Sequence, residues 1–190
     1  MTDRDEGTGI SPAEPRLRAE LLAMAEEDAQ IRSKLLADGS LFKGDYDPHM
    51  EQAHRRHAER LEMILAHHGW PGRSLVGSDG AEAAWLILQH AIAIPELQRS
   101  ALPLLRRAVA EREAEPLHVA YLEDRIAFFE GRPQRYGTHF DWDAGGELSP
   151  HPIADADQVD VRRAEVGLPP LAEQIKSMRQ RSAAEGEAPP

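Results

Sequence analysis

In the stretch Ala81-Glu82-Ala83-Ala84-Trp85-Leu86-Ile87-Leu88-Gln89-His90-Ala91-Ile92, apolar residues cover nearly the whole circumference of a predicted helix. A helix that is apolar on all sides is usually buried at the centre of a domain. Trp85 is therefore expected in the core. Other helices must surround this segment, so the sequence predicts a mainly α-helical protein.

Helical signals flank the central segment on both sides. Apolar residues recur at spacings of three and four, prolines stand at first-turn positions, and glycines follow the last turns. These signals predict helices at about 14–37, 48–68, 95–112, 117–130 and 170–178. The segment from Trp70 to Gly77 is predicted to be a connector. We expect one compact helical domain of about five to six helices.

The pattern changes near residues 138–150. Thr138, Phe140 and Trp142 alternate with polar residues, and Ala144-Gly145-Gly146 is a turn signal. A small β-hairpin or extended segment is predicted there. We expect a disordered lead-in at residues 1–12, the helical domain at 13–180 and a disordered tail at 181–190, because the two ends are polar and rich in Gly or Pro.

Composition excludes several classes of function. The 190 residues include no cysteine, which excludes disulfides, thiolate nucleophiles and Cys-based metal sites. The formal net charge of -11 disfavours binding to nucleic acid or to an anionic membrane surface. A signal peptide and a membrane-spanning apolar run are both missing. We therefore expect a cytoplasmic protein, and the sequence does not indicate its oligomeric state.

Two aspartates occupy places in apolar helical stripes. Asp28 lies four residues after Met24, and Asp124 lies three residues after Tyr121. A buried carboxylate must be paired, hydrogen-bonded or protonated. Each aspartate can therefore be a structural residue, and for Asp28 the structural partner would be Arg32. Alternatively, each is a positioned functional group with an unusual pKa.

His90 follows Gln89 in the central helix. The side chains of both residues can form hydrogen bonds with backbone carbonyls in the core, which would make them structural. Alternatively, His90 is a general acid or base, because imidazole titrates near neutral pH. Clustering of His90 with Asp28 or Asp124 would resemble the carboxylate–histidine half of a catalytic triad.

The sequence disfavours a metal site. His54 and His57 have a workable ligand spacing on a helix, but three arginines, Arg55, Arg56 and Arg60, stand among them. No metalloprotease or calcium-loop motif is present, and no phosphate-loop, dinucleotide or nucleophile-elbow motif occurs. We therefore expect no metal and no cofactor.

A segment dense in polar side chains follows the helix that carries Asp124. Gln134, Tyr136, Gly137 and Thr138 can read a polar ligand, with Gly137 permitting close approach of the backbone. The alternative is that the aromatic side chains of this segment only pin the loop to the core.

Several of these residues match one known pattern in order. It includes Asp28 with Arg32, Gly69-Trp70-Pro71, Gln89-His90, Asp124-Arg125, and Gln134 with Tyr136-Gly137-Thr138. The chain resembles the bacterial domain-of-unknown-function family 6624 over roughly Leu17 to Leu171. It departs from that pattern at Ala29 and His139, where the family usually has Gln. The resemblance implies a fold and a site location but no activity.

Together these features predict a small enzyme or ligand-binding domain with a polar pocket. His90, Asp124 and Asp28 are the candidate catalytic residues for metal-free acid–base chemistry, by hydrolysis or group transfer. The candidate substrate-binding residues, for a small polar or anionic molecule, are Arg32, Gln89, Arg125, Gln134, Tyr136, Gly137 and Thr138. The alternative is a non-catalytic interaction module, an adaptor or immunity-like protein, in which these residues are structural.

Overall fold

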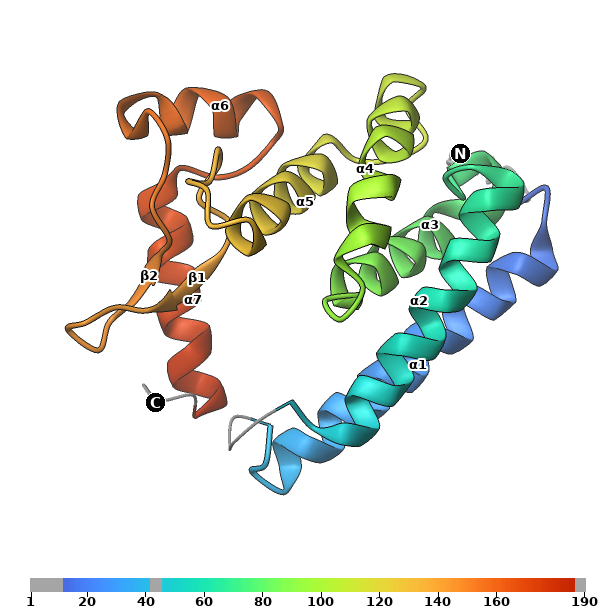
Figure 1. The fold of residues 1–190 in the computed structure, drawn as a ribbon, viewed down its shortest axis with the longest axis horizontal. Helices are drawn as coiled ribbons and strands as arrows, with labels where there is room; N and C mark the ends of the chain where they lie inside the picture. Colours follow the sequence, from blue (N-terminus) through green and yellow to red (C-terminus); the bar gives the residue numbers. More distant parts are fainter. Residues whose placement is uncertain (1–11, 42–45, 187–190) are drawn as a thin grey trace, which may run out of the picture.

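The computed structural model of the chain describes residues 12–41 and 46–186. Five helices form its first two thirds (Figure 1), and they are α1 (Pro15–Ala37), α2 (Pro48–His68), α3 (Arg73–His90), α4 (Pro95–Ala110) and α5 (Pro116–Phe129). Helix α3 packs against α1, α2 and α4, and α4 packs against α5. The described residues thus confirm the mainly α-helical fold.

Local sequence explains where these helices begin. Proline stands in the first turn of α1, α2, α4 and α5, where its missing N–H is not needed. The carboxylate of Asp47 caps α2 by accepting hydrogen bonds from the backbone N–H groups of His49 and Met50. Gly69 ends α2 with a φ of 71°, which glycine adopts at little cost.

The central helix lies in the core, as its composition predicts. Ala84 and Leu88 are fully buried, and Trp85 stacks on the ring of His118 from α5. The helix begins earlier than predicted, at Arg73, so the Trp70–Gly77 connector includes a helical turn. Gly77 breaks that turn from the longer helix with a φ of 75°, which explains why the sequence pattern starts only after it.

The C-terminal third carries the predicted hairpin. Strands β1 (Phe140–Trp142) and β2 (Leu148–Pro150) pair antiparallel, with Phe140 opposite Pro150. A short 3-10 turn (Ala156–Gln158), α6 (Val159–Glu165) and α7 (Leu171–Glu185) follow. Figure 1 shows these elements together on the side of α5 that faces away from α1 and α2.

Helix α7 corrects the prediction of a disordered tail from residue 181. It runs to Glu185, where a carboxylate oxygen lies 2.6 Å from Nη2 of Arg32 on α1. Ser182 is buried on the same helix. The polar tail sequence is therefore helical as far as Glu185 because tertiary contacts hold it. The expected lead-in, apart from Pro12, lies outside the described residues, which include no helix long and apolar enough to cross a membrane.

Candidate functional site

Three helices bring Asp28, His54 and His90 together. Asp28 lies on α1, His54 on α2, and His90 is the last residue of α3. Nδ1 of His90 lies 3.1 Å from Oδ1 of Asp28, and Nε2 of His54 contacts the same oxygen. The two imidazole rings are tilted, with centroids 4.9 Å apart. One carboxylate oxygen thus faces two histidines.

Helical periodicity places these side chains inside the bundle. Asp28 shares the buried stripe of α1 with Leu21 and Leu35, one on each side at a spacing of seven. His54 shares the buried stripe of α2 with Leu61, again seven residues away. Asp28 is 6% exposed and His54 7%. The cluster is therefore fixed by the packing of α1, α2 and α3 rather than by a mobile loop.

Hydrogen bonds keep Asp28 ionised in spite of its burial. Burial by itself raises the pKa of the carboxyl, but the hydrogen bonds from His54 and His90 outweigh it, so the pKa lies well below its usual range. Tyr46 completes the cluster, because its hydroxyl contacts Nδ1 of His54. Burial, together with the charge of Asp28, raises the pKa of Tyr46 to about 12, so Tyr46 is a neutral phenol at pH 7.

The arginines that follow His54 in sequence do not surround it in space. Each is engaged by an acid outside the cluster: Arg55 by Glu51, Arg56 by Glu27 and Arg60 by Glu20. The charges that disfavour a cation in the sequence are thus neutralised away from the imidazole of His54.

His57, one turn further along α2, has a different partner. Its Nε2 lies 2.9 Å from Oε2 of Glu27. His54 and His57 therefore face separate carboxylates, and the helical spacing of three that could suggest a shared ligand does not produce one.

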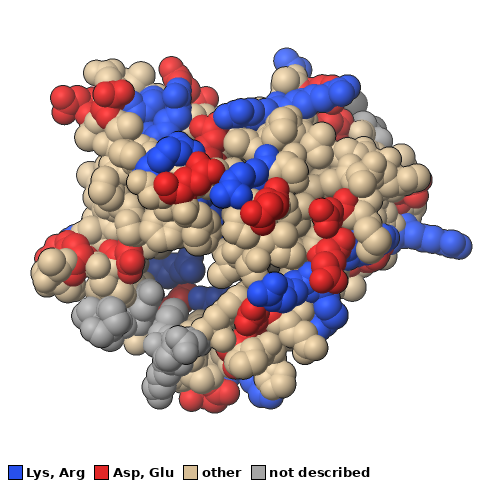
Figure 2. All heavy atoms as spheres, viewed as in Figure 1, with Lys and Arg blue, Asp and Glu red and all other residues tan. Residues whose placement is uncertain are grey.

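A cavity of about 200 Å³ opens beside the cluster. Its lining consists of Asp28, Arg32, Leu41, Tyr46, Met50, His54, His90, Ile92 and Arg125. The lining thus combines three apolar side chains with the polar cluster and two guanidinium groups. Figure 2 shows that this face of the molecule is hollowed between the hairpin region and the end of α1, with basic and acidic side chains inside the hollow.

The two arginines of this cavity differ in their partners. Arg32 is neutralised by Glu185 of α7. Arg125 forms no hydrogen bond or ion pair with any residue that the structure describes. Burial lowers the pKa of Arg125, and no neighbouring acid opposes that shift. Since Arg remains charged in proteins, the cavity has a partly desolvated cation without a counter-ion among the described residues.

Asp124 and the polar loop form a second, separate cluster. The carboxylate of Asp124 accepts hydrogen bonds from the backbone N–H groups of Arg135, Tyr136 and Thr138 and from the Thr138 hydroxyl, at 2.7–3.2 Å. Gln134 is also satisfied, by the backbone of His139 and His151.

None of Asp124, Gln134, Tyr136, Gly137 and Thr138 lines the cavity beside Asp28. The structure therefore brings Asp28, His90, Arg32 and Arg125 to one place and the loop residues to another. Gln89 does not line the cavity either, and its backbone carbonyl lies 3.5 Å from Nε2 of Gln98.

Sequence reasoning did not select His54 and Tyr46. His54 had a detectable signal, because it stands four residues after Met50 and seven before Leu61 and so belongs to the inward stripe of its helix. The three arginines near it in the sequence argued against a cation site, so His54 was not selected. Tyr46 has no such periodicity, since it precedes α2.

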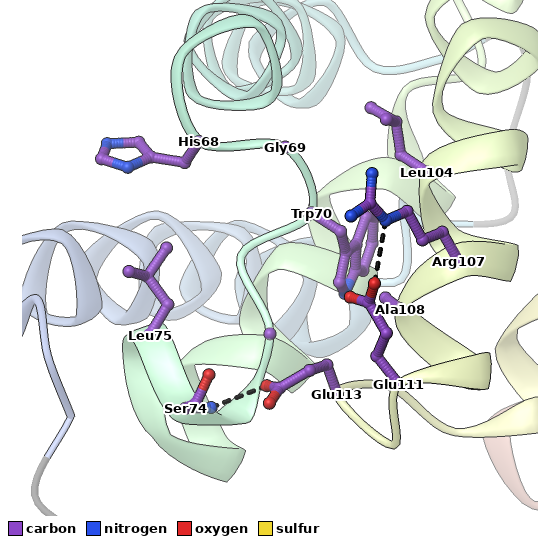
Figure 3. A pocket seen from close by; sticks show the side chains of 11 residues that line it. His68, Gly69, Trp70, Ser74, Leu75, Leu104, Arg107, Ala108, Glu111 and Glu113 are labelled. Carbon is purple, nitrogen blue, oxygen red and sulfur yellow. Dashed lines mark hydrogen bonds and ion pairs between the residues drawn. The ribbon is translucent and has the colours of Figure 1, made fainter.

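A larger cavity, of about 430 Å³, lies between the α2–α3 connection and α4 (Figure 3). Trp70, which is 9% exposed, lines it, and Arg107 and Glu111 pair with each other beside this ring. The carboxylate of Glu113 accepts a hydrogen bond from the backbone N–H of Ser74. Its charged groups are thus engaged, and it contains no cluster like that of Asp28.

The fold and the site define a mainly helical protein with a buried His–Asp–His cluster that borders a small polar cavity. A family model described as a family of unknown function, DUF6624, matches residues 15–184. The chain belongs to this family. No curated protein and no solved structure matches the chain.

Proposed function

We propose that this protein binds a small anionic molecule in the cavity between Arg125 and the Asp28–His54–His90 cluster and acts on it by acid–base chemistry. One observation carries the proposal: Arg125 faces this cavity without an acidic partner among the described residues. A desolvated guanidinium is costly unless an anion pairs with it. Carboxylate and phosphate groups match its planar fork of donors.

The size and lining of the cavity define the ligand further. A volume of about 200 Å³ lies below the roughly 300–1,000 Å³ of pockets for drug-sized molecules, so the ligand is smaller than a typical drug. Leu41, Met50 and Ile92 offer an apolar wall. A short organic acid or a small phosphate ester fits these constraints.

The Asp28–His90 pair in the lining of the cavity can transfer protons. Asp28 orients the ring of His90 through Nδ1, and the His90 side chain is 33% exposed, so its Nε2 can reach a ligand or water. A carboxylate behind an imidazole is the arrangement that supports general acid–base catalysis. This pair supports hydrolysis or group transfer on the bound anion as the proposed chemistry. A cytoplasmic setting fits the cysteine-free sequence.

Anion-dependent thermal stability tests this proposal. Wild-type protein is titrated with acetate, butyrate, hexanoate and inorganic phosphate at constant ionic strength, with Arg125→Met and Arg106→Met variants in parallel. Arg106 is an exposed arginine paired with Glu123, so its loss controls for a change of net charge. We expect the melting temperature of the wild type and of Arg106→Met to rise with at least one anion, and that of Arg125→Met to stay constant.

Two results would contradict the proposal. If no anion stabilises the wild type, the cavity does not bind an anion, and a non-catalytic interaction module with structural Asp, His and Arg residues becomes the better explanation. If Arg125→Met responds as the wild type does, the anions bind elsewhere.

A further inference from the structure

We propose that Asp28, His54 and His90 bind a divalent metal ion of the zinc class at the reactive end of this cavity. The inference rests on the proposed function for what the ion acts on, but the binding of the ion can be measured on its own. It replaces the expectation of metal-free chemistry with a specific ligand set: Oδ1 of Asp28, Nε2 of His54 and Nδ1 of His90.

The positions of the three donor atoms fit an ion. All lie within 4.8 Å of one another. Two ligands about 2.1 Å from a tetrahedral zinc ion stand about 3.4 Å apart, a separation inside the range of this cluster. Nδ1 of His90 and Oδ1 of Asp28 are already 3.1 Å apart. His54 and Asp28 are in closer contact, so this pair would separate slightly around the ion.

Tyr46 supplies the outer contact that a histidine ligand requires. A metal-bound imidazole usually donates its other N–H to an oxygen acceptor, which fixes the tautomer and the ring orientation. The hydroxyl of Tyr46 lies against Nδ1 of His54, on the side of the ring opposite Asp28. With Nδ1–H donated to Tyr46, the lone pair on Nε2 of His54 points toward the ion.

The surrounding charges admit a cation. Asp28 offers a carboxylate oxygen at the centre of the cluster, in contact with both histidines. The arginines next to His54 are held by Glu51, Glu27 and Glu20 outside the cluster. Among the cavity residues, Arg32 is paired with Glu185, and Arg125 is the group that the proposed anionic ligand neutralises.

The donor set also selects the metal. Two imidazole nitrogens and one carboxylate oxygen suit zinc, iron, cobalt or nickel, whereas magnesium and calcium prefer sets made only of oxygen. Three protein ligands leave at least one coordination position open, as catalytic sites do and structural zinc sites do not. All three ligand residues line the cavity, so the open position would be accessible to the anionic ligand.

An ion in this cluster changes which group handles the proton. With Nδ1 of His90 bound to the metal, His90 no longer serves as the base. A water molecule bound to the ion would act as the base instead, because the charge of the ion lowers the pKa of the bound water toward 7. The cavity and Arg125 would still bind the anionic ligand.

Metal binding to tag-free protein tests the inference, because the chain has nine histidines and a histidine tag would add more. Chelator-treated protein is titrated with Zn²⁺ in a calorimeter, with Mg²⁺ and Ca²⁺ as comparisons. We expect one Zn²⁺ per chain and no comparable binding of the other two. His54→Gln and His90→Gln should each weaken Zn²⁺ binding by more than the roughly 10–100-fold that loss of an outer hydrogen bond costs.

His57→Gln is the matched control. It removes a buried histidine of α2 that also contacts a carboxylate of α1, Glu27, but contributes no atom to the cluster. It should bind Zn²⁺ as the wild type does. His90 is partly exposed at a helix end, so His90→Gln should keep its fold even if the buried His54→Gln variant does not, and melting curves of the chelator-treated variants check this.

Each outcome decides the inference. The inference is overturned if the wild type does not bind Zn²⁺ tightly. It is also overturned if the folded His90→Gln variant binds Zn²⁺ as tightly as the wild type, because the ion then binds adventitiously at other histidines. If Zn²⁺ does not bind while anions still stabilise the protein through Arg125, the proposed function holds without the ion. If Zn²⁺ binds as expected and no anion does, the metal site stands and the proposed function fails.

Discussion

Replacement of Asp124 by asparagine should destabilise the protein strongly. This carboxylate is fully buried and receives four donors from the loop that follows α5. An asparagine side chain has one oxygen, which accepts hydrogen bonds, and one NH₂ group, which donates them. Its NH₂ group must therefore lie against N–H or O–H groups of the loop that have no acceptor there. In the better orientation the NH₂ group replaces Oδ2, and the backbone N–H of Thr138 then loses its acceptor.

The magnitude follows from these contacts. One buried N–H without an acceptor costs about 1–3 kcal/mol. The two bonds to Oδ1, from Arg135 and Tyr136, lose the charge of their acceptor, which costs about 1 kcal/mol each, since charge-assisted bonds are roughly twice as strong as neutral ones. A destabilisation of about 3 kcal/mol or more results. It corresponds to a fall in melting temperature of roughly 6–12 °C for a domain of this size.

Urea denaturation at pH 7, followed by far-UV circular dichroism, measures this change. Asp157→Asn, at an exposed position, controls for the loss of one acidic charge. Thr138→Val removes only the hydroxyl bond and should cost about 1–2 kcal/mol. A change below about 1 kcal/mol for Asp124→Asn would refute the structural role argued here. It would return Asp124 to the candidate catalytic residues, because functional sites tolerate such changes without loss of stability.

Three other predictions concern a glycine, the effect of acid pH and the contact between Tyr46 and His54. Gly137→Ala should cost about 1 kcal/mol more than Gly131→Ala in urea unfolding. Both have positive φ, but only at Gly137 would a new Cβ displace side chains, because it would lie 2.6 Å from Cδ1 of Ile153 and 3.1 Å from Cδ1 of Leu171. Burial lowers the pKa of His118 and of His139 to about 4. The stability that the neutral imidazoles provide above pH 6.5 should therefore be lost as the pH falls toward 4. In the double variant His118→Gln/His139→Gln, the urea midpoint should vary less between pH 7 and pH 5 than in the wild type. Tyr46→Phe should weaken Zn²⁺ binding roughly 10–100-fold in calorimetry, and an unchanged affinity would contradict its contact with His54.

The sequence predicts the fold well because the fold depends on periodicity. The all-round apolar stretch containing Trp85 lies in the core, and proline marks the first turn of four helices. The errors lie where tertiary contacts override local composition. The helical turn before Gly77 is held by Glu113, which accepts hydrogen bonds from the backbone N–H groups of Arg73 and Ser74. Glu185 extends α7 into a segment with the composition of a disordered tail.

The candidate site is harder to predict, because periodicity shows which side chains point inward but not which of them meet. Asp28 and Asp124 have the same sequence signal, a carboxylate in an apolar stripe followed closely by arginine. Asp28 meets two histidines from other helices, whereas Asp124 meets the backbone of a loop only 11 to 14 residues further along the chain. That difference in partners cannot be read from either helix alone.

The partners also determine what each aspartate can do. The donors to Asp124 are backbone N–H groups and a hydroxyl, which do not change protonation state near neutral pH, so this carboxylate can only hold the loop in place. The partners of Asp28 are two imidazoles, which can gain a proton, lose one, or offer a lone pair to a metal ion. Of two inward aspartates with equal sequence signals, Asp28 is therefore the one whose surroundings can take part in a reaction. Arg125, which pairs with no acid among residues 12–41 and 46–186, lines the same cavity.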